Sequence, residues 1–229
     1  KRVKFRPSSM QYCINNKRYK KQPDGNDLDT LTRIEGLPIP RALPTSRFPI
    51  EKMYHGSRLQ PKGFTHIHHF FFPRAAQSLS LMWEKACAHK DARLRQILLF
   101  WVEQGIAPMS VLNRYRANQG SQSNQVLSGV YYVPSQIAEI SVEYRFRSKL
   151  EQLIKTFPRD SRQYGNAVIS NGTAGNLPLE NETVDYVFTD PPFGENIFYA
   201  DLNFMTEAWH RVTTDATPEA IVDKFKKKA

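Results

Sequence analysis

Residues 184–211 constrain the fold most. "VDYVFT" (184–189) is a short apolar run bounded by polar residues, as expected for a strand inside a parallel sheet. "ADLNFMTEAWHR" (200–211) then places four apolar residues on one helical face: Leu202, Met205, Ala208 and Trp209. In open α/β sheets, ligands bind where strands end and loops lead into helices. The sequence therefore predicts an α/β fold with a functional loop between this strand and this helix.

The loop itself begins "DPPFG". Asp190 is a carboxylate at the strand tip, and Pro191 and Pro192 keep the backbone extended with carbonyl groups free to accept hydrogen bonds. Phe193 offers a flat apolar face. Several acceptors beside one aromatic ring suit a planar ring that carries an exocyclic amino group, such as a flipped nucleobase. A rigid turn without a ligand is the alternative for the tetrapeptide.

This D-P-P-F sequence, residues 190–193, resembles the D/N/S-P-P-Y/F motif of amino-directed DNA methyltransferases, which use S-adenosylmethionine. "GFTHIHHFFFPRAAQSLSLMW", "NQVLSGVYYVPS" and "YADLNFMTEAWHR" are also similar to large site-specific methylases found with bacterial defence systems, including restriction–modification. The branch resemblance spans about residues 62–224. It implies a partial Rossmann-like methyltransferase sheet in the C-terminal part of the chain.

The resemblance also implies roles for residues. Asp190 and the Pro191 carbonyl would accept hydrogen bonds from the target amino group, Pro192 would complete the rigid motif, and Phe193 would stack on the flipped base. Asn171, Thr173 and Asp190 would lie near S-adenosylmethionine. In this family the methyl group passes in one displacement, without a cysteine nucleophile or a metal. The D-P-P form favours adenine N6 over cytosine N4.

One family motif is missing. The aromatic-x-Gly-x-Gly loop that holds the cofactor does not occur in these 229 residues. We therefore expect a methyltransferase fragment that binds S-adenosylmethionine weakly or not at all and has no turnover alone. The remainder of the enzyme, or another chain, would supply the cofactor motif. Two alternatives remain open. One is an RNA methyltransferase acting on guanine N2 or adenine N6, and the other is a nucleic-acid-binding module without activity.

The charge balance points to a polyanionic partner. The net charge is +10 and the pI is about 9.6, which favours double-stranded DNA, although solubility alone is another explanation. Two polar segments carry the residue types that bind phosphates and base edges, and solvated loops would have a similar composition. Their candidate residues are Lys17, Arg18, Lys20, Lys21, Arg114, Arg116, Asn118 and Gln119.

Composition and hydrophobic periodicity divide the chain into three regions. Residues 1–62 hold 14 Lys and Arg and 7 of the 15 prolines, so we expect extended chain that buries little, with a turn at 23–29. Residues 63–160 should contain helices and a β-hairpin and form a possible DNA-contacting part. Residues 161–229 should be a partial methyltransferase domain. The predicted helices span 73–90, 91–105 and 148–157, and the predicted strands span 126–134, 139–147 and 164–172.

The histidines and cysteines of the sequence do not indicate a metal site or disulfide bonds. His66, His68 and His69 suggest a metal site, but packing or phosphate contacts explain them better because no carboxylate lies nearby in the sequence. Two cysteines, Cys13 and Cys87, cannot form a disulfide framework, so a reducing cytoplasm is the expected location. No apolar run is long enough for a membrane span.

Overall fold

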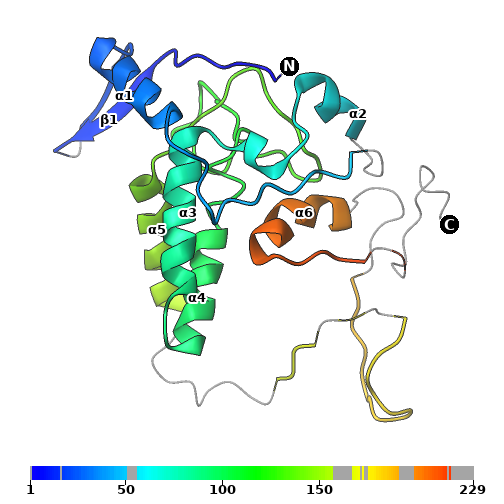
Figure 1. Ribbon diagram of the computed structural model, residues 1–229. Coiled ribbons are helices and arrows are strands. Elements are labelled where there is room, and N and C mark those ends of the chain that lie inside the picture. Colours follow the sequence, from blue (N-terminus) through cyan, green and yellow to red (C-terminus); the bar gives the residue numbers. More distant parts are fainter. Residues whose placement is uncertain are drawn as a thin grey trace.

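The computed structural model describes residues 2–15, 17–50, 56–156, 167–170, 172, 175–190, 199–215 and 217. Within these ranges the chain is α/β, with helices and a two-stranded antiparallel sheet (Figure 1). The described ranges contain no Rossmann-like sheet. None of their helices combines the length and the apolar character that a membrane span requires.

The basic N-terminal segment contains a β-hairpin, which follows the irregular residues 2–9. Strand β1 (Met10–Ile14) pairs with β2 (Lys17–Lys21), so that Met10 lies opposite Lys21 and Ile14 opposite Lys17. Asn15 has a φ of 49°, in the left-handed region that asparagine tolerates at turns. The hairpin projects from one edge of the molecule, beside helix α1 (Gly25–Glu35) (Figure 1).

The turn predicted at 23–29 is wrong, because these residues begin helix α1. The Asp24 side chain accepts from the backbone N–H of Asp27 at 3.1 Å, and the Asp27 side chain accepts from that of Asp24 at 2.9 Å. This reciprocal pair is a capping box, with aspartate in place of the usual glutamate. Aspartate and glycine are common both in turns and at helix starts, and here the aspartates cap a helix.

The first 62 residues also bury more than expected. Leu43, Phe48, Ile50 and Leu59 all belong to the hydrophobic core. The ring centroid of Phe48 lies 5.0 Å from that of Phe70 and 5.0 Å from that of Tyr131. Composition favours an extended segment, but these four apolar residues anchor it to the core. The segment ends with α2 (Gly56–Leu59) and η1 (Gln60–Lys62), and η2 (Ile67–Phe70) follows it.

Helices α3 (Pro73–Cys87) and α4 (Ala92–Glu103) confirm the predicted helices at 73–90 and 91–105. Pro73 occupies the first turn of α3, where a missing N–H costs nothing. The Asp91 side chain caps α4 by accepting from Leu94 N at 2.7 Å. The inner face of α3 is a stripe of mostly small and apolar residues: Ala75, Ala76, Leu79, Ser80, Trp83 and Ala86.

The hairpin predicted from 126–134 and 139–147 is wrong. Residues 126–141 form no strand, and helix α5 (Val142–Thr156) begins inside the second predicted strand. The predicted helix at 148–157 is the C-terminal part of α5. Phe146 is buried in α5, and its ring lies edge-on to Trp101 of α4. Packing against α3 and α4, which lie beside α5 in Figure 1, thus overrides the local preference for strand.

Helix α6 (Tyr199–His210) confirms the helix predicted at 200–211. Trp209 is 1% exposed, and its ring lies 5.3 Å from that of Trp83 on α3. The Tyr131 hydroxyl donates to the Leu202 carbonyl at 2.7 Å and accepts from Met205 N at 3.2 Å. Burial raises the pKa of Tyr131, which keeps this hydroxyl protonated as a donor. These contacts fix α6 against the side of the core that contains Phe48.

Candidate nucleic-acid interface

The D-P-P-F motif lies at the edge of what the structure describes. Asp190 is exposed and ends residues 184–190, which form no strand, so the strand predicted at 184–189 is wrong. Pro191, Pro192 and Phe193 lie outside the described residues, as do Asn171 and Thr173.

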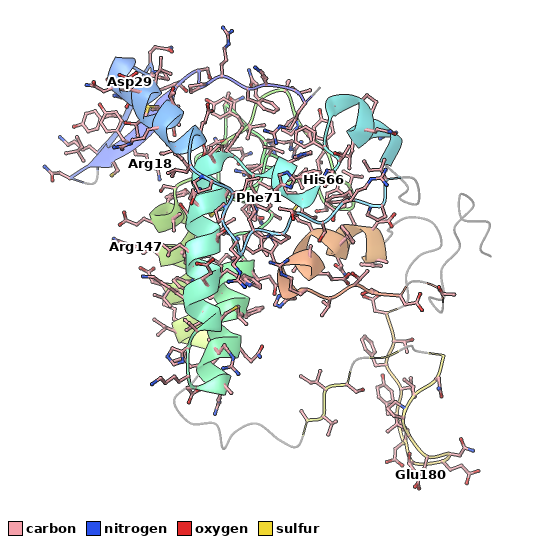
Figure 2. All side chains as sticks on the ribbon, viewed as in Figure 1. Arg18, Asp29, His66, Phe71, Arg147 and Glu180 are labelled. Atoms are coloured by element: carbon pink, nitrogen blue, oxygen red, sulfur yellow. The ribbon has the colours of Figure 1, made fainter. Side chains whose placement is uncertain are left out.

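The segments around the motif are unusually exposed. Val168 and Ile169, in the strand predicted at 164–172, are 95% and 96% exposed, and Phe188 of the predicted strand 184–189 is 84% exposed. Residues 164–166 and 171 of the first strand lie outside the described ranges. Glu180 marks this part of the chain, away from the helices (Figure 2). The described residues bring no other functional group to Asp190.

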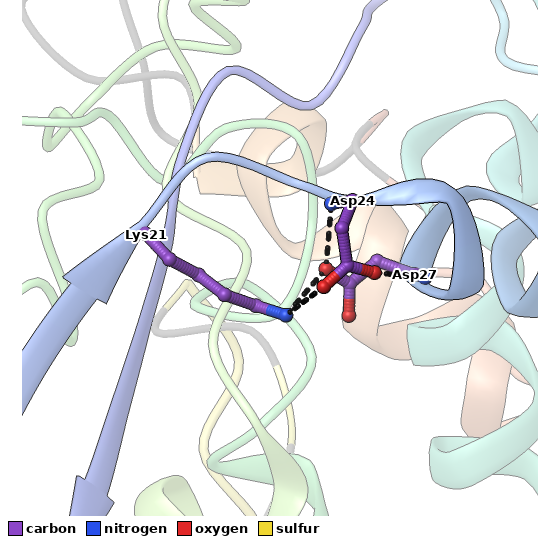
Figure 3. Close-up of polar contacts among 3 residues, drawn as sticks. All are labelled: Lys21, Asp24 and Asp27. Atoms are coloured by element: carbon purple, nitrogen blue, oxygen red, sulfur yellow. Dashed lines mark hydrogen bonds and ion pairs between the residues drawn. The ribbon is translucent and has the colours of Figure 1, made fainter.

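The β1–β2 hairpin carries four of the predicted nucleic-acid contacts. Lys17, Arg18 and Lys20 are exposed on β2, as expected. Lys21 differs, because its ammonium group lies 2.7 Å from a carboxylate oxygen of Asp24 and 2.7 Å from one of Asp27 (Figure 3). Lys21 therefore joins the hairpin to the start of α1, and it is not a free contact for phosphate.

This ion pair has clear electrostatic consequences. Hydrogen bonds to Asp24 and Asp27 raise the pKa of Lys21 above its ordinary value. Lys21 in turn lowers the pKa of Asp24. Lys21 and Asp24 thus both stay charged near neutral pH, and the exposed cations of the hairpin are Lys17, Arg18 and Lys20.

The second predicted segment, residues 113–125, is a loop whose backbone is held by side-chain hydrogen bonds. Asn113 is fully buried at its base, where its Nδ2 donates to the carbonyls of Gln122 (2.9 Å) and Ala138 (2.7 Å). Its Oδ1 accepts from Gln125 N at 2.8 Å. One amide side chain thereby closes the loop and joins it to residue 138.

Gln122 holds the interior of the loop. Its Nε2 donates to the carbonyls of Arg116 (2.8 Å) and Gln119 (2.9 Å), and its Oε1 accepts from Arg116 N at 2.9 Å. These bonds fix the backbone of 116–119 while Arg116, Asn118 and Gln119 themselves remain exposed. Arg114 is half-buried, and its Nε donates to the Gln125 carbonyl at 3.0 Å, so it supports the loop and is less available to a ligand.

Arg145 of α5 holds the loop through hydrogen bonds. Its Nη1 donates to Ser123 Oγ at 3.1 Å and its Nε to the Gln104 carbonyl at 3.0 Å. Burial lowers the pKa of this guanidinium, whose ordinary value is so high that it remains charged. The loop is thus fastened to the ends of α4 and α5.

The hairpin and the loop meet directly, although about a hundred residues separate them. Arg18 of β2, labelled on the hairpin in Figure 2, donates from Nη1 to the Gly120 carbonyl at 3.0 Å. The contact joins two segments that the sequence predicts independently. We call their exposed candidate residues the basic interface: Arg18 and Lys20 on the hairpin face that adjoins the loop, Lys17 on the other face of the hairpin, and Arg116, Asn118 and Gln119 in the loop.

The basic interface has the chemistry of a nucleic-acid contact. Lys17, Lys20 and Arg116 can bind phosphate oxygens, while Asn118 and Gln119 have the paired donor and acceptor atoms that read base edges. The loop backbone is already fixed, so binding need not order it. Such an arrangement can hold a polyanion.

The three histidines form a packed cluster. The ring centroids of His68 and His69 lie 4.3 Å apart, and His66 lies within 5.5 Å of both. Burial lowers the pKa of His68 and lowers that of His69 to about 4, with the neighbouring imidazoles and Arg2 adding repulsion. Among the described residues no His, Cys, Asp and Glu side chains gather into a metal-binding group.

A surface cavity of about 490 Å³ lies elsewhere, between α3, α4 and α6. Its lining includes Arg41, Trp83, Cys87, Trp209 and Arg211. None of the residues predicted from sequence to form a site is among those that line it. The Arg211 guanidinium donates at 3.4 Å to the backbone carbonyls of Arg41 and Ala42, so one of its two arginines is already engaged.

Sequence reasoning missed the residues that build the loop. Asn113, Gln122 and Arg145 do not differ in type from their polar neighbours. Asn113 does follow directly after the apolar "MSVL", a position that favours burial, and this was the available signal. Comparison with known proteins adds nothing to this description, because no protein-family model, no curated protein and no solved structure matches the chain.

Proposed function

We propose that this chain binds double-stranded DNA through the basic interface and presents a flipped base for S-adenosylmethionine-dependent methylation of its amino group, adenine N6 first. The contact between Arg18 and Gly120 carries the DNA-binding part, because it unites two independently predicted segments. The net charge of +10 supports a polyanionic partner. The methylation part rests on the resemblance of residues 190–193 to the amino-methyltransferase motif.

In this proposal the described residue of the motif binds the target base and does not bind the cofactor. The Asp190 carboxylate is exposed and can accept a hydrogen bond from an exocyclic amino group. Of the residues expected near S-adenosylmethionine, Asp190 alone lies in the described ranges. The cofactor itself would supply an electrophilic methyl group.

DNA binding is tested first with the 229-residue chain and a fluorescent 20-base-pair duplex. Replacing Lys17, Lys20 and Arg116 together by alanine should weaken binding and reduce the slope of log K against log salt by about 3, since each lost phosphate contact contributes about 0.9. The matched control replaces Lys85, Lys90 and Arg93, which are exposed at the opposite end of α3 (Figure 1). Equal effects of both triple variants would contradict a localised interface. An RNA duplex of the same sequence tests the RNA alternative.

Methylation is tested in the natural protein that contains this chain. Asp190→Ala should abolish methyl transfer to DNA, because the amino group loses its acceptor, and should leave duplex affinity unchanged. Tritium transfer and fluorescence anisotropy measure the two properties. A binding module without activity is the second candidate, favoured by the contact between Arg18 and Gly120 that joins the two basic segments. That candidate predicts no methyl transfer before the substitution.

A further inference from the structure

The two faces of the β1–β2 hairpin have different chemistry. Side chains alternate along a strand, and residues paired across the hairpin share a face. Tyr12 pairs with Tyr19, and Arg18 pairs with Cys13 on the opposite face. The Arg18 face adjoins the loop through Gly120. The tyrosine face therefore points away from this contact.

The tyrosine pair is a flat aromatic surface in contact with solvent. The two rings stack with centroids 5.5 Å apart and an interplanar angle of 19°. Tyr12 is 41% exposed and Tyr19 is 43% exposed. A cross-strand aromatic pair stabilises a hairpin, but it does not need so much exposed ring surface for that purpose.

Charge on the tyrosine face is arranged around the rings. Lys21 lies at the base of the hairpin and is held by Asp24 and Asp27. Lys17 lies on the same face at the other end of β2 and is exposed. A phosphate beside the rings would thus meet an ammonium group that lies two residues from Tyr19.

We propose that the Tyr12–Tyr19 face is a stacking platform for an unpaired base, with Lys17 binding the adjoining phosphate. Exposed aromatic rings beside cations are the combination that holds single-stranded nucleic acid, because every base has a face that can stack. The inference rests on the proposed function, which places the basic interface on DNA and requires a base to leave the duplex. An opened duplex offers unpaired bases, whereas an intact one does not.

The experiment compares two DNA probes with the 229-residue chain. One is a perfect 20-base-pair duplex, and the other is the same duplex with a three-nucleotide single-stranded gap. The wild-type chain should bind the gapped probe at least about fivefold more tightly, the lower end of what one aromatic–base stack contributes. The double variant Tyr12→Leu/Tyr19→Leu keeps an apolar cross-strand pair without a flat ring, and it should lose this preference while retaining affinity for the perfect duplex.

Two control variants isolate the ring face. Tyr12→Phe/Tyr19→Phe keeps the aromatic surface and should keep the preference for the gapped probe. Tyr132→Leu removes a tyrosine of similar exposure, 47%, from outside the hairpin and should also keep it. In the wild-type chain, the ring-proton resonances of Tyr12 and Tyr19 should move upfield on adding the gapped probe, as stacked rings do.

The outcomes separate the two proposals. If the chain binds neither probe, the proposed DNA binding is wrong and the platform with it. If wild-type affinity is equal for both probes, or if the leucine variant weakens both equally, the platform is wrong and DNA binding stands. If the leucine variant fails to fold, the wild-type ring shifts decide: unchanged resonances overturn the platform.

Discussion

The side chain of Asn113 joins three stretches of backbone at once. It is fully buried, and its three hydrogen bonds connect the start of the loop to residues 122, 125 and 138. A buried amide with every polar atom satisfied stabilises and specifies a conformation, whereas the same group left unpaired is costly. Asn113 therefore helps to hold the loop in place from a fully buried position.

Asn113→Ala should lower the free energy of unfolding by about 2–4 kcal/mol, because three hydrogen bonds are lost and buried backbone groups remain unpaired. Urea denaturation followed by circular dichroism measures the change. Asn118→Ala, an exposed amide on the same loop, should change stability by less than about 0.5 kcal/mol. Similar losses in both variants would show that the burial of Asn113 has no particular effect.

The outward-facing residues of the loop could be predicted from sequence, and Asn113 could not. Arg116, Asn118 and Gln119 have the side chains that a polyanion contact needs, and the structure leaves them exposed. Which amide of a polar stretch turns inward depends on the carbonyl groups that other segments bring to it, and a linear sequence does not contain that information. The meeting of Arg18 with Gly120 is a non-local contact of the same kind.

At the scale of elements, the approach of α5 to the end of α4 depends on Gly105. A Cβ atom built at this position would overlap the Phe146 ring, and it would lie 3.1 Å from Leu79 Cδ2. Glycine thus permits three helices to approach closely at one point. The backbone of Gly105 has no need of a left-handed conformation, so the requirement is one of space.

Gly105→Ala should lower the free energy of unfolding by about 1–3 kcal/mol, the usual cost of overpacking a core. Thermal unfolding measures the effect. Gly120→Ala is the comparison, because nothing lies within 4 Å of a Cβ built there. If Gly105→Ala is as stable as Gly120→Ala, the core at this point is more adaptable than the packing indicates.

Local sequence predicts three of the helices correctly and predicts the wrong secondary structure for the start of α5. Helices α3, α4 and α6 are predicted correctly because each has a continuous apolar stripe, and Pro73 and Asp91 mark two of the starts. "EISVEYRFR" has the β-branched and aromatic residues of a strand, yet most of it is helical. Burial of Phe146 and the contacts of Arg145 with Gln104 decide its conformation, and both partners belong to other elements.

At the scale of the molecule, the histidine cluster couples stability to pH. Ile67 and Phe70, which flank His68 and His69, are fully buried in the core, so the cluster cannot rearrange without disturbing it. Burial sets the pKa of His69 at about 4, below its ordinary value of 6.5. Between these values the unfolded chain binds more protons than the folded one, so stability falls as the pH falls.

The free energy of unfolding should therefore be at its full value above pH 6.5 and decrease as the pH is lowered toward 4. Urea midpoints measured at several pH values test this, at constant ionic strength. His69→Gln should reduce the slope, since an uncharged amide takes up no proton. A slope that is unchanged in this variant would assign the acid sensitivity to other groups.

The exposed segments 167–170 and 184–188 have a consequence for the behaviour of the chain in concentrated solution. Val168, Ile169 and Phe188 are almost wholly in contact with water, and "VDYVFT" combines high strand propensity with one charge and no proline. Short segments of this kind template intermolecular β-pairing when their backbone groups lack partners. Colloidal stability is thus set by a region that contributes nothing to the core, and self-association should begin there while the helices remain folded.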